Sequence, residues 1–176
     1  MTNKRIKEKA GKIKLLILDV DGVMTDGSII LDNEGNELKR FHVRDGHGIK
    51  MIQKAGITVG IITGRKSNVL KLRAKELGIK EVYQKVFKKS LVYEKLLEKY
   101  ECKDDNVAFM GDDIVDRELF KRAGLTAAPA DAEEYAKNWA DLVTKRGGGR
   151  GAVREFVDLI LRSSGLWEKV SGESLD

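Results

Sequence analysis

The 176-residue sequence predicts an α/β fold, in which a Rossmann-like, doubly wound, mostly parallel sheet carries helices on both faces. Short apolar runs alternate with segments of helical spacing, and several of these segments end at glycine, a common helix stop. Strands and helices that alternate in this way form a mostly parallel sheet with helices on either side. The apolar and charged fractions, 41% and 35%, are those of an ordinary globular protein.

Six segments have the composition of buried strands. Three are nearly continuous apolar runs, as expected for strands covered on both faces: residues 14–20, 57–63 and 106–112. Three weaker ones are residues 81–84, 125–130 and 140–144. Between the strands, helical spacing predicts helices over residues 45–56, 66–78, 88–100, 113–124, 131–140 and 152–164.

Residues 27–43 interrupt this alternation. Two β-type runs flank residues 32–36, whose sequence "DNEGN" is typical of a turn, so we expect a β-hairpin inserted after the first strand. Open α/β sheets place their sites at the carboxyl ends of the strands, and the hairpin should therefore stand over the site. The glycine cluster of residues 145–151 precedes a helix and predicts a flexible or ligand-approaching loop.

The bulk properties exclude several classes of protein. We expect a single domain over residues 1–176, with no apolar run approaching the ~20 residues of a membrane span. The basic N-terminus lacks the apolar core of a secretory signal. One cysteine excludes an internal disulfide, and the cytoplasm is the expected location. The net charge of +5 is dispersed without an aromatic-rich basic stripe, which favours an anionic small molecule or a solvated surface over nucleic acid.

Two carboxylates, Asp19 and Asp21, follow the first strand. Carboxylates this close repel each other unless a cation or a shared proton relieves them. A hard divalent cation such as Mg²⁺ prefers oxygen ligands of this kind. A second acidic cluster, Asp112, Asp113 and Asp116, ends another strand, and Asp112 would complete the acidic site if both strands are central. By itself this cluster could be a helix cap.

Thr63 ends the second strong strand and is followed by Gly64 and Arg65. A hydroxyl and backbone N–H groups at a strand-to-helix turn suit a phosphate. Lys89 begins a predicted helix, where its charge opposes the helix dipole, and contact with a phosphate-bearing acidic site would explain that position. Lys88 is an alternative, because spacing does not choose between the two lysines.

In this order, four segments resemble the motifs of the haloacid dehalogenase superfamily of phosphohydrolases: "LLILDVDGVMTDG", "IITGR", "KKS" and "MGDDIVD". From about residue 12 onward, further segments are similar to those of its phosphatases for 3-deoxy-D-manno-octulosonate 8-phosphate: "ELKRFHVRDGHGIK", "IITGRKS" and "GGGRGAVRE". The resemblance implies a small HAD-like domain without a separate cap, a homotetramer, and a step in lipopolysaccharide biosynthesis. Lys85 departs from the pattern, since relatives usually carry glycine there.

The resemblance also implies the roles of the site residues. Asp19 would attack phosphorus and form an aspartyl-phosphate, and Asp21 would protonate the leaving alkoxide and then activate water. Mg²⁺ would be held by Asp19, by the backbone carbonyl of Asp21 and by Asp112. Thr63, Gly64 and Lys89 would bind the phosphoryl oxygens, and Asp113 and Asp116 would lie behind them and orient Lys89.

The sugar-acid end of the substrate would meet residues near the hairpin. The candidates are Lys50, one turn into the following helix, Arg65, Arg73, and His42, Val43, Arg44, Asp45 and Gly46. A position about 12 Å along its helix would direct Arg73 away from the phosphate, toward the hairpin or a neighbouring subunit. We expect residues 166–176 to have few apolar anchors and to be mobile, and similar tails in the family reach an adjacent site.

A projecting hairpin would expose Ile29, Ile30, Leu31 and Phe41, and such apolar surface is usually covered. Four hairpins packed in a cyclic ring would cover it, so that each site would be lidded by its neighbour.

Three other interpretations stay open at this point. A phosphatase for sialic-acid-type nine-carbon 9-phosphates shares the scaffold. A signalling receiver domain also has acidic residues, a threonine and a lysine on a parallel sheet, but its phosphoacceptor lies on a later strand than its acidic pair. A catalytically silent oligomerisation or regulatory module would retain the fold without hydrolysis.

Overall fold

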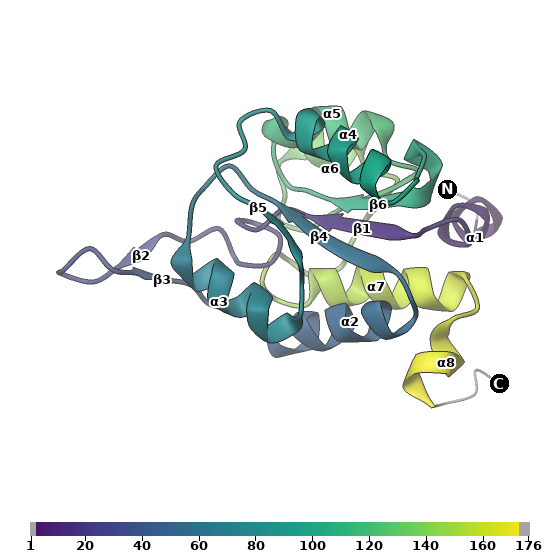
Figure 1. Ribbon diagram of the computed structural model, residues 1–176, viewed down its shortest axis with the longest axis horizontal. Coiled ribbons are helices and arrows are strands. Elements are labelled where there is room, and N and C mark those ends of the chain that lie inside the picture. The colour runs from purple at the N-terminus through teal and green to yellow at the C-terminus, as the bar shows by residue number, and fades with distance from the viewer. Residues whose placement is uncertain (1–2, 173–176) are drawn as a thin grey trace.

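The computed structural model describes residues 3–172, and at its centre lies a six-stranded sheet (Figure 1). The strand order is β5-β4-β1-β6-β7-β8, and every neighbouring pair is parallel. The strands are β1 (Leu15–Leu18), β4 (Thr58–Ile62), β5 (Glu81–Tyr83), β6 (Val107–Met110), β7 (Leu125–Ala128) and β8 (Leu142–Val143). All six predicted strands are confirmed, and the predicted α/β class with them.

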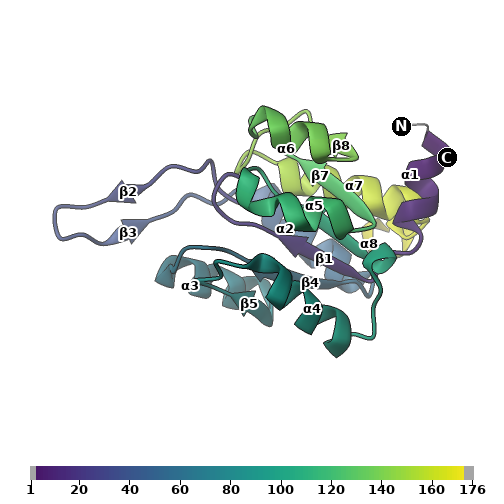
Figure 2. The same cartoon turned by 90° about the horizontal axis from the view of Figure 1, so that it is seen from above.

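Alternate side chains of β1 enter two different cores, because successive residues of a strand point to opposite faces. Leu16 and Leu18 join the core formed with α1 (Asn3–Ala10), α2 (Val43–Lys54), α3 (Asn68–Leu77), α7 (Ala152–Ser163) and α8 (Trp167–Ser171). Leu15 and Ile17 join the core formed with α4 (Lys89–Lys99), α5 (Arg117–Arg122) and α6 (Glu134–Trp139). Figures 1 and 2 show the two helical layers on either side of the sheet, which makes it doubly wound.

A two-stranded hairpin, β2 (Ile30–Leu31) and β3 (Glu37–Leu38), projects from one end of the molecule (Figures 1 and 2). Its turn is held by the Asp32 carboxylate, which accepts hydrogen bonds from the backbone N–H of Glu34 and of Asn36. The predicted hairpin is confirmed, although only two residues on each side pair. Phe41 corrects one detail: it is partly buried against the core at the base of the hairpin instead of lying exposed on it.

Three further segments differ from the sequence predictions. The predicted helix over 113–124 begins with a three-residue 3₁₀ turn, η2 (Ile114–Asp116), before α5, and another 3₁₀ turn, η1 (Asp104–Asn106), precedes β6. Helix α1 was not anticipated. The expectation of few apolar anchors after residue 166 is wrong for its first half, because Trp167 and Val170 of α8 are buried in the core. Residues 173–176 of that tail lie outside the described residues.

The register of the central strands places the functional loops at one edge of the sheet. Leu18, the last residue of β1, pairs with Ile61 of β4 on one side and with Met110 of β6 on the other. The residues that follow these strands therefore emerge side by side at the carboxyl edge. Across residues 3–172, no helix has the length and apolar character needed to cross a membrane.

Candidate functional site

Asp19 continues the line of β1, and its backbone N–H donates to the carbonyl of Met110 on β6. Its residue exposure is only 7%, so a carboxylate has been carried into a nearly dry position. The buried Oδ1 atom accepts no hydrogen bond from the described residues, although Lys89 Nζ lies 3.1 Å away. A buried carboxylate oxygen without a hydrogen bond is costly, and this one faces the acidic site.

Lys89 is the first residue of α4, and its side chain is 3% exposed. Its ammonium donates to Asp116 Oδ1 at 2.6 Å and lies beside Asp19. Burial lowers the pKa of Lys89, but the charges of Asp19 and Asp116 outweigh burial and leave that pKa raised. Lys88 is exposed, so the geometry selects Lys89 as the lysine of the site.

Asp112 follows β6 and approaches the Asp19 carboxylate from the neighbouring strand. The turn after β1 fits closely against it: a methyl group on Gly22, whose φ is +84°, would overlap the Asp112 carboxylate. Only glycine combines this backbone conformation with this approach. The predicted convergence of Asp19 and Asp112 is thus present, and glycine at position 22 makes it possible.

Burial and neighbouring negative charges disfavour the ionised forms of Asp19 and Asp112. Burial has the largest effect on the pKa of Asp19 and raises it. The positive charge of Lys89 lowers this pKa and the negative charge of Asp116 raises it, and the result is a pKa of about 7. Burial, followed by the charges of Asp19 and Asp116, raises the pKa of Asp112 to about 8. A site that resists ionisation of its own carboxylates is one that a divalent cation would stabilise.

A donor set for such a cation is present. Oxygen atoms of Asp19, Asp112 and Asp116 lie within 4.8 Å of one another. Asp116, however, already accepts hydrogen bonds from Lys89 and from the backbone N–H groups of Asp112 and Asp113. Asp19, with its unbonded Oδ1, and Asp112 therefore fit a hard cation best, and Asp116 supports Lys89 from behind, as predicted.

Asp21 points toward the base of the hairpin, where sequence reasoning placed no partner for it. The Lys39 ammonium contacts Asp21 Oδ1 and lies 3.4 Å from Glu37 Oε1, and the Lys39 side chain is only 2% exposed. Arg65 Nη2 donates to Glu37 at 3.0 Å, and Arg65 Nε lies 3.9 Å from Asp21 Oδ2. Sequence analysis missed Glu37 and Lys39, although alternate positions on a predicted strand share a face, and that was the available signal.

The phosphate candidates surround a cavity of about 340 Å³ at this edge. Its lining includes Asp19, Asp21, Gly22, Gly27, Thr63, Gly64, Arg65, Lys89, Asp112, Asp113 and Val115. Thr63 is 3% exposed, and its Oγ1 accepts from the backbone N–H of Arg65 at 3.4 Å, which leaves the hydroxyl proton available. The loop below it holds Lys85 at a φ of +57°, a conformation in which glycine is unstrained.

Asp113 lies at the rim of the cavity. Its carboxylate caps the 3₁₀ turn by accepting from the Ile114 N–H and also accepts a hydrogen bond from the Tyr135 hydroxyl at 2.6 Å. Asp113 thus fixes the loop after β6 instead of contacting Lys89.

The candidates at the start of α2 divide into surface and structural residues. Val43 and Arg44 are exposed at the base of the hairpin, and His42 caps the helix by accepting from the Arg44 N–H. Asp45 is 3% exposed and accepts hydrogen bonds from the backbone N–H groups of Gly151 and Arg154. The Asp45 carboxylate therefore caps α7 and does not line the cavity that holds Asp19, and its contact with substrate stays a prediction.

Gly46 also serves packing, since a methyl group there would collide with the Arg73 guanidinium. The Arg73 side chain is largely buried at the base of the hairpin, with Cζ 5.8 Å from the centroid of the Phe41 ring and Nη1 2.8 Å from Glu76 Oε2. Its predicted orientation away from the phosphate, toward the hairpin, agrees with this position. Neither residue lines the cavity that holds Asp19.

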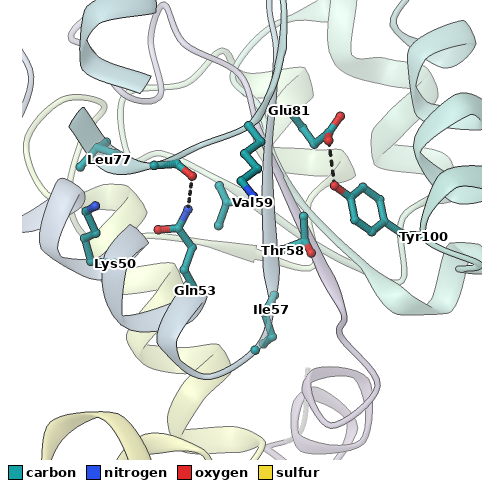
Figure 3. A pocket seen from close by; sticks show the side chains of 11 residues that line it. Lys50, Gln53, Ile57, Thr58, Val59, Leu77, Glu81 and Tyr100 are labelled. Carbon is teal, nitrogen blue, oxygen red and sulfur yellow. Dashed lines mark hydrogen bonds between the residues drawn. The ribbon is translucent and has the colours of Figure 1, made fainter. Parts of the chain in front are cut away.

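The position of Lys50 on its helix differs from the sequence prediction. Helix α2 begins at Val43, so Lys50 is two turns along it and not one. Figure 3 shows Lys50 and Gln53 beside Leu77 and the start of β4, in a hollow at the opposite edge of the sheet. A direct contact of Lys50 with substrate in this protomer's own cavity is therefore excluded.

The chain was compared with known proteins. Residues 75–155 match the family model of haloacid dehalogenase-like hydrolases. The 3-deoxy-D-manno-octulosonate 8-phosphate phosphatase of Escherichia coli (strain B / BL21-DE3) is 45% identical over 170 residues, which cover 97% of this chain and 90% of that protein.

Solved structures agree with this similarity. The corresponding phosphatase of Yersinia pestis superposes with a TM-score of 0.93 at 44% identity, covering 97% of this chain and 92% of that one. The Moraxella catarrhalis phosphatase, solved with magnesium ion, phosphate ion and KDO, gives a TM-score of 0.94 at 37% identity over 98% of both chains. The receiver-domain alternative is thereby wrong. The chain belongs to the haloacid dehalogenase-like hydrolases and, within them, to the 3-deoxy-D-manno-octulosonate 8-phosphate phosphatases.

Proposed function

We propose that this protein hydrolyses 3-deoxy-D-manno-octulosonate 8-phosphate to the free sugar acid and phosphate, in lipopolysaccharide biosynthesis. The observation that carries the proposal is the buried group of Asp19, Lys89 and Asp116 beside Asp112, at the carboxyl edge of a sheet shared with phosphatases of this specificity. An anionic sugar-phosphate substrate also suits a chain of net charge +5.

The chemistry begins with Asp19 as the nucleophile. Its carboxylate attacks phosphorus, the bond to the sugar oxygen breaks, and an aspartyl-phosphate forms. Asp21 gives a proton to the departing alkoxide and then takes one from the water that hydrolyses the aspartyl-phosphate. Lys89 balances the charge of the nucleophile and of the phosphoryl oxygens. Its side chain is buried, so solvent does not screen its charge.

Mg²⁺ fits the donor set. The Asp19 and Asp112 carboxylates would hold it together with the backbone carbonyl of Asp21, whose side chain is engaged by Lys39. When bound, the ion offsets the repulsion between the carboxylates and a phosphate dianion. Thr63, through its hydroxyl, and the backbone of Gly64 would bind the phosphoryl oxygens, a role supported by their position in the lining of the cavity.

The sugar-acid end would meet the rim of the cavity. Arg65 is 41% exposed there and lines the cavity, and Arg44 and His42 lie at the base of the hairpin. We assign the substrate carboxylate to this basic side of the rim. Arg73 stays a candidate for contact with a neighbouring subunit's substrate, since its side chain lies beside Phe41 and does not line the cavity that holds Asp19.

A homotetramer with lidded sites is part of the proposal. The hairpin exposes Ile29, Leu31 and Leu38 by 62%, 58% and 56%, and beside the cavity mouth Phe87 is 96% exposed. Apolar surfaces of this kind favour a second copy of the chain as the cover. Light scattering should give a tetrameric mass, and a monomeric mass would contradict the lid. The single cysteine agrees with a cytoplasmic location.

Phosphate release from a panel of sugar phosphates tests the function. The panel holds the eight-carbon 8-phosphate, nine-carbon 9-phosphates, hexose 6-phosphates and an aryl phosphate, each with Mg²⁺ and with EDTA. We expect a strong preference for the eight-carbon substrate that disappears with EDTA. Preference for a nine-carbon 9-phosphate would retain the chemistry and transfer the substrate to the sialic-acid-type alternative. Complete inactivity with Mg²⁺ would instead support the silent module.

A further inference from the structure

The glycine loop of residues 145–151 packs against the turn that carries Asp21 and Gly22. The Gly149 N–H donates to the carbonyl of Val23 at 3.0 Å. A methyl group on Gly148 would overlap the carbonyl of Gly22 and lie 2.8 Å from the carbonyl oxygen of Thr25. The two backbones therefore meet with no room for a side chain between them.

Three carboxylates from three different elements hold this loop. Asp131, which follows β7, accepts from the Gly148 N–H at 2.8 Å. Glu155 of α7 accepts from the N–H groups of Lys145 and Arg146 at 2.8 and 3.2 Å. Asp45 of α2 accepts from the Gly151 N–H at 3.2 Å. A loop rich in glycine is costly to order, and these bonds offset that cost.

The same supports reach the acidic residues of the site. The Glu133 N–H, two residues after Asp131, donates to the carbonyl of Asp112 at 3.1 Å. Gly22, on which the loop rests, is in turn packed against the Asp112 carboxylate. Segment 131–133 thus holds Asp112 directly and holds the turn after Asp21 through the glycine loop.

We propose that loop 145–151 is a positioning element for the proposed cation site, and that Asp131 is its positioning residue. The loop fixes the turn of residues 20–26, and so sets the separation between the Asp21 backbone carbonyl and the Asp112 carboxylate. A hard cation tolerates little error in ligand position, so a displaced turn weakens binding even where every ligand is intact. The inference rests on the proposed function only for its activity readout.

Two substitutions test the loop. Gly148→Ala requires the loop and the turn to separate by roughly 1 Å or more to restore an ordinary contact. Asp131→Ala removes the bond to Gly148 from an exposed residue, and therefore leaves the cores intact. Both should weaken Mg²⁺ binding by about 10-fold to 100-fold, and Gly148→Ala should lower kcat/KM by about 100-fold.

Mg²⁺ affinity is measured by calorimetric titration with the metal alone. Amide hydrogen exchange of residues 20–26 is measured in the metal-free protein, where the N–H groups of Val23, Met24 and Thr25 are bonded to the Val20 carbonyl. Both variants should exchange faster in this segment. These readouts do not depend on turnover, so they remain informative if the panel of sugar phosphates identifies another substrate.

Asp141→Ala is the matched control. The Asp141 carboxylate also accepts a backbone N–H, that of Thr126 at 3.0 Å, and pairs with Lys9, but it does not touch the glycine loop. This variant should lower Tm and leave Mg²⁺ affinity unchanged. Unchanged affinity and exchange in Asp131→Ala, or an equal loss of affinity in Asp141→Ala, would overturn the inference. Should Gly148→Ala fail to fold, Asp131→Ala decides alone.

Discussion

Buried acidic side chains have opposite surroundings at the amino edge of the central sheet, where the parallel strands begin, and at its carboxyl edge, where they end. At the amino edge, Glu81 is buried beside a hollow of about 500 Å³, and its carboxylate accepts hydrogen bonds from Tyr83, Lys99 and Tyr100. Figure 3 shows the bond from Tyr100. At the carboxyl edge, beside a smaller cavity of about 340 Å³, Asp19 and Asp116 share one buried lysine, and Asp112 lies close to both carboxylates without a lysine of its own among the contacts of the described residues.

The pKa values express this difference. Burial raises the pKa of Glu81, but its three hydrogen-bond donors outweigh burial and leave that pKa lowered. The pKa values of Asp19 and Asp112 are raised instead, to about 7 and about 8. If the size of the hollow were the criterion, the functional site would have been assigned to the amino edge. Uncompensated buried charge locates the chemistry, because only such charge requires a cation or a reaction partner.

The largest expected effect contrasts the two acids directly. Asp19→Asn should lower kcat by ~10⁴-fold or more, since the nucleophile is lost. Glu81→Gln should leave kcat unchanged within about two-fold and reduce the free energy of unfolding by about 1–3 kcal/mol, because its donors lose a charged acceptor. Steady-state kinetics and urea unfolding measure the pair. If Glu81→Gln lost turnover at full stability, the contrast between the edges would be wrong.

Lys89→Met should have the next largest effect. Removing the ammonium leaves Asp19 and Asp116 without the buried positive charge that they share, and kcat should fall by about 10²–10³-fold. The exposed neighbour Lys88 provides the control, and Lys88→Met should retain turnover. Equal losses in the two variants would mean that burial is the wrong criterion for choosing between the two lysines.

Stability against pH tests the strained carboxylates in the metal-free protein. Asp19 and Asp112 have pKa values in the folded state above the ordinary carboxyl value of 3.8, so the folded state holds their protons more tightly. Their contribution is complete at low pH and is lost as pH rises through about 7 and 8. Tm should therefore fall between about pH 5 and about pH 8, a window above the transitions of ordinary carboxylates.

Saturating Mg²⁺ should raise Tm more at the upper end of this window than at the lower end, because it replaces the protons. Asp112→Asn should flatten the fall. A Tm that rose steadily over the window in the metal-free wild type would show that the buried acids are already compensated.

A smaller effect concerns backbone strain at both edges. Lys85, below the Thr63 loop, and Glu101, after α4, adopt φ values of +57° and +48°. Each replacement by glycine should raise the free energy of unfolding by about 1 kcal/mol. Kinetics should change by less than about two-fold in either variant. Destabilisation by either substitution, measured in urea, would mean that the side chain contributes more than its backbone conformation costs.

The smallest expected effect is none at all. Lys50→Ala, in the larger hollow, should leave KM for the sugar phosphate unchanged, because Lys50 lies at the amino edge. A several-fold increase in KM would show that the larger hollow takes part in substrate binding after all.

Sequence reasoning predicted the sheet well because buried strands are written in local composition. Residues 15–18 are purely aliphatic, and their alternation between two cores needs no long-range information. Helix α8 was missed for the opposite reason. Its few apolar residues, Trp167 and Val170, become anchors only when the core beneath them exists.

The site divides in the same way. Asp19, Asp112, Thr63 and Lys89 follow or precede elements whose ends could be placed, so their convergence was predictable. The ion pair between Lys39 and Asp21 depends on how far the hairpin folds back. The hydrogen bonds of Asp45 depend on a helix that lies more than 100 residues later in the chain. Such partners are set by tertiary packing, which a single sequence taken alone does not reveal.

The paired register of β1 limits how this chain can vary in length. Leu18 is level with Ile61 and with Met110, so one residue gained or lost within any of the three strands would shift a loop by about 3.3 Å and turn its side chains to the other face. Connections at the amino edge, such as residues 100–106, do not position the loops that carry the acidic residues. Insertions and deletions among homologues should therefore accumulate there, while the distance from strand to acid stays constant.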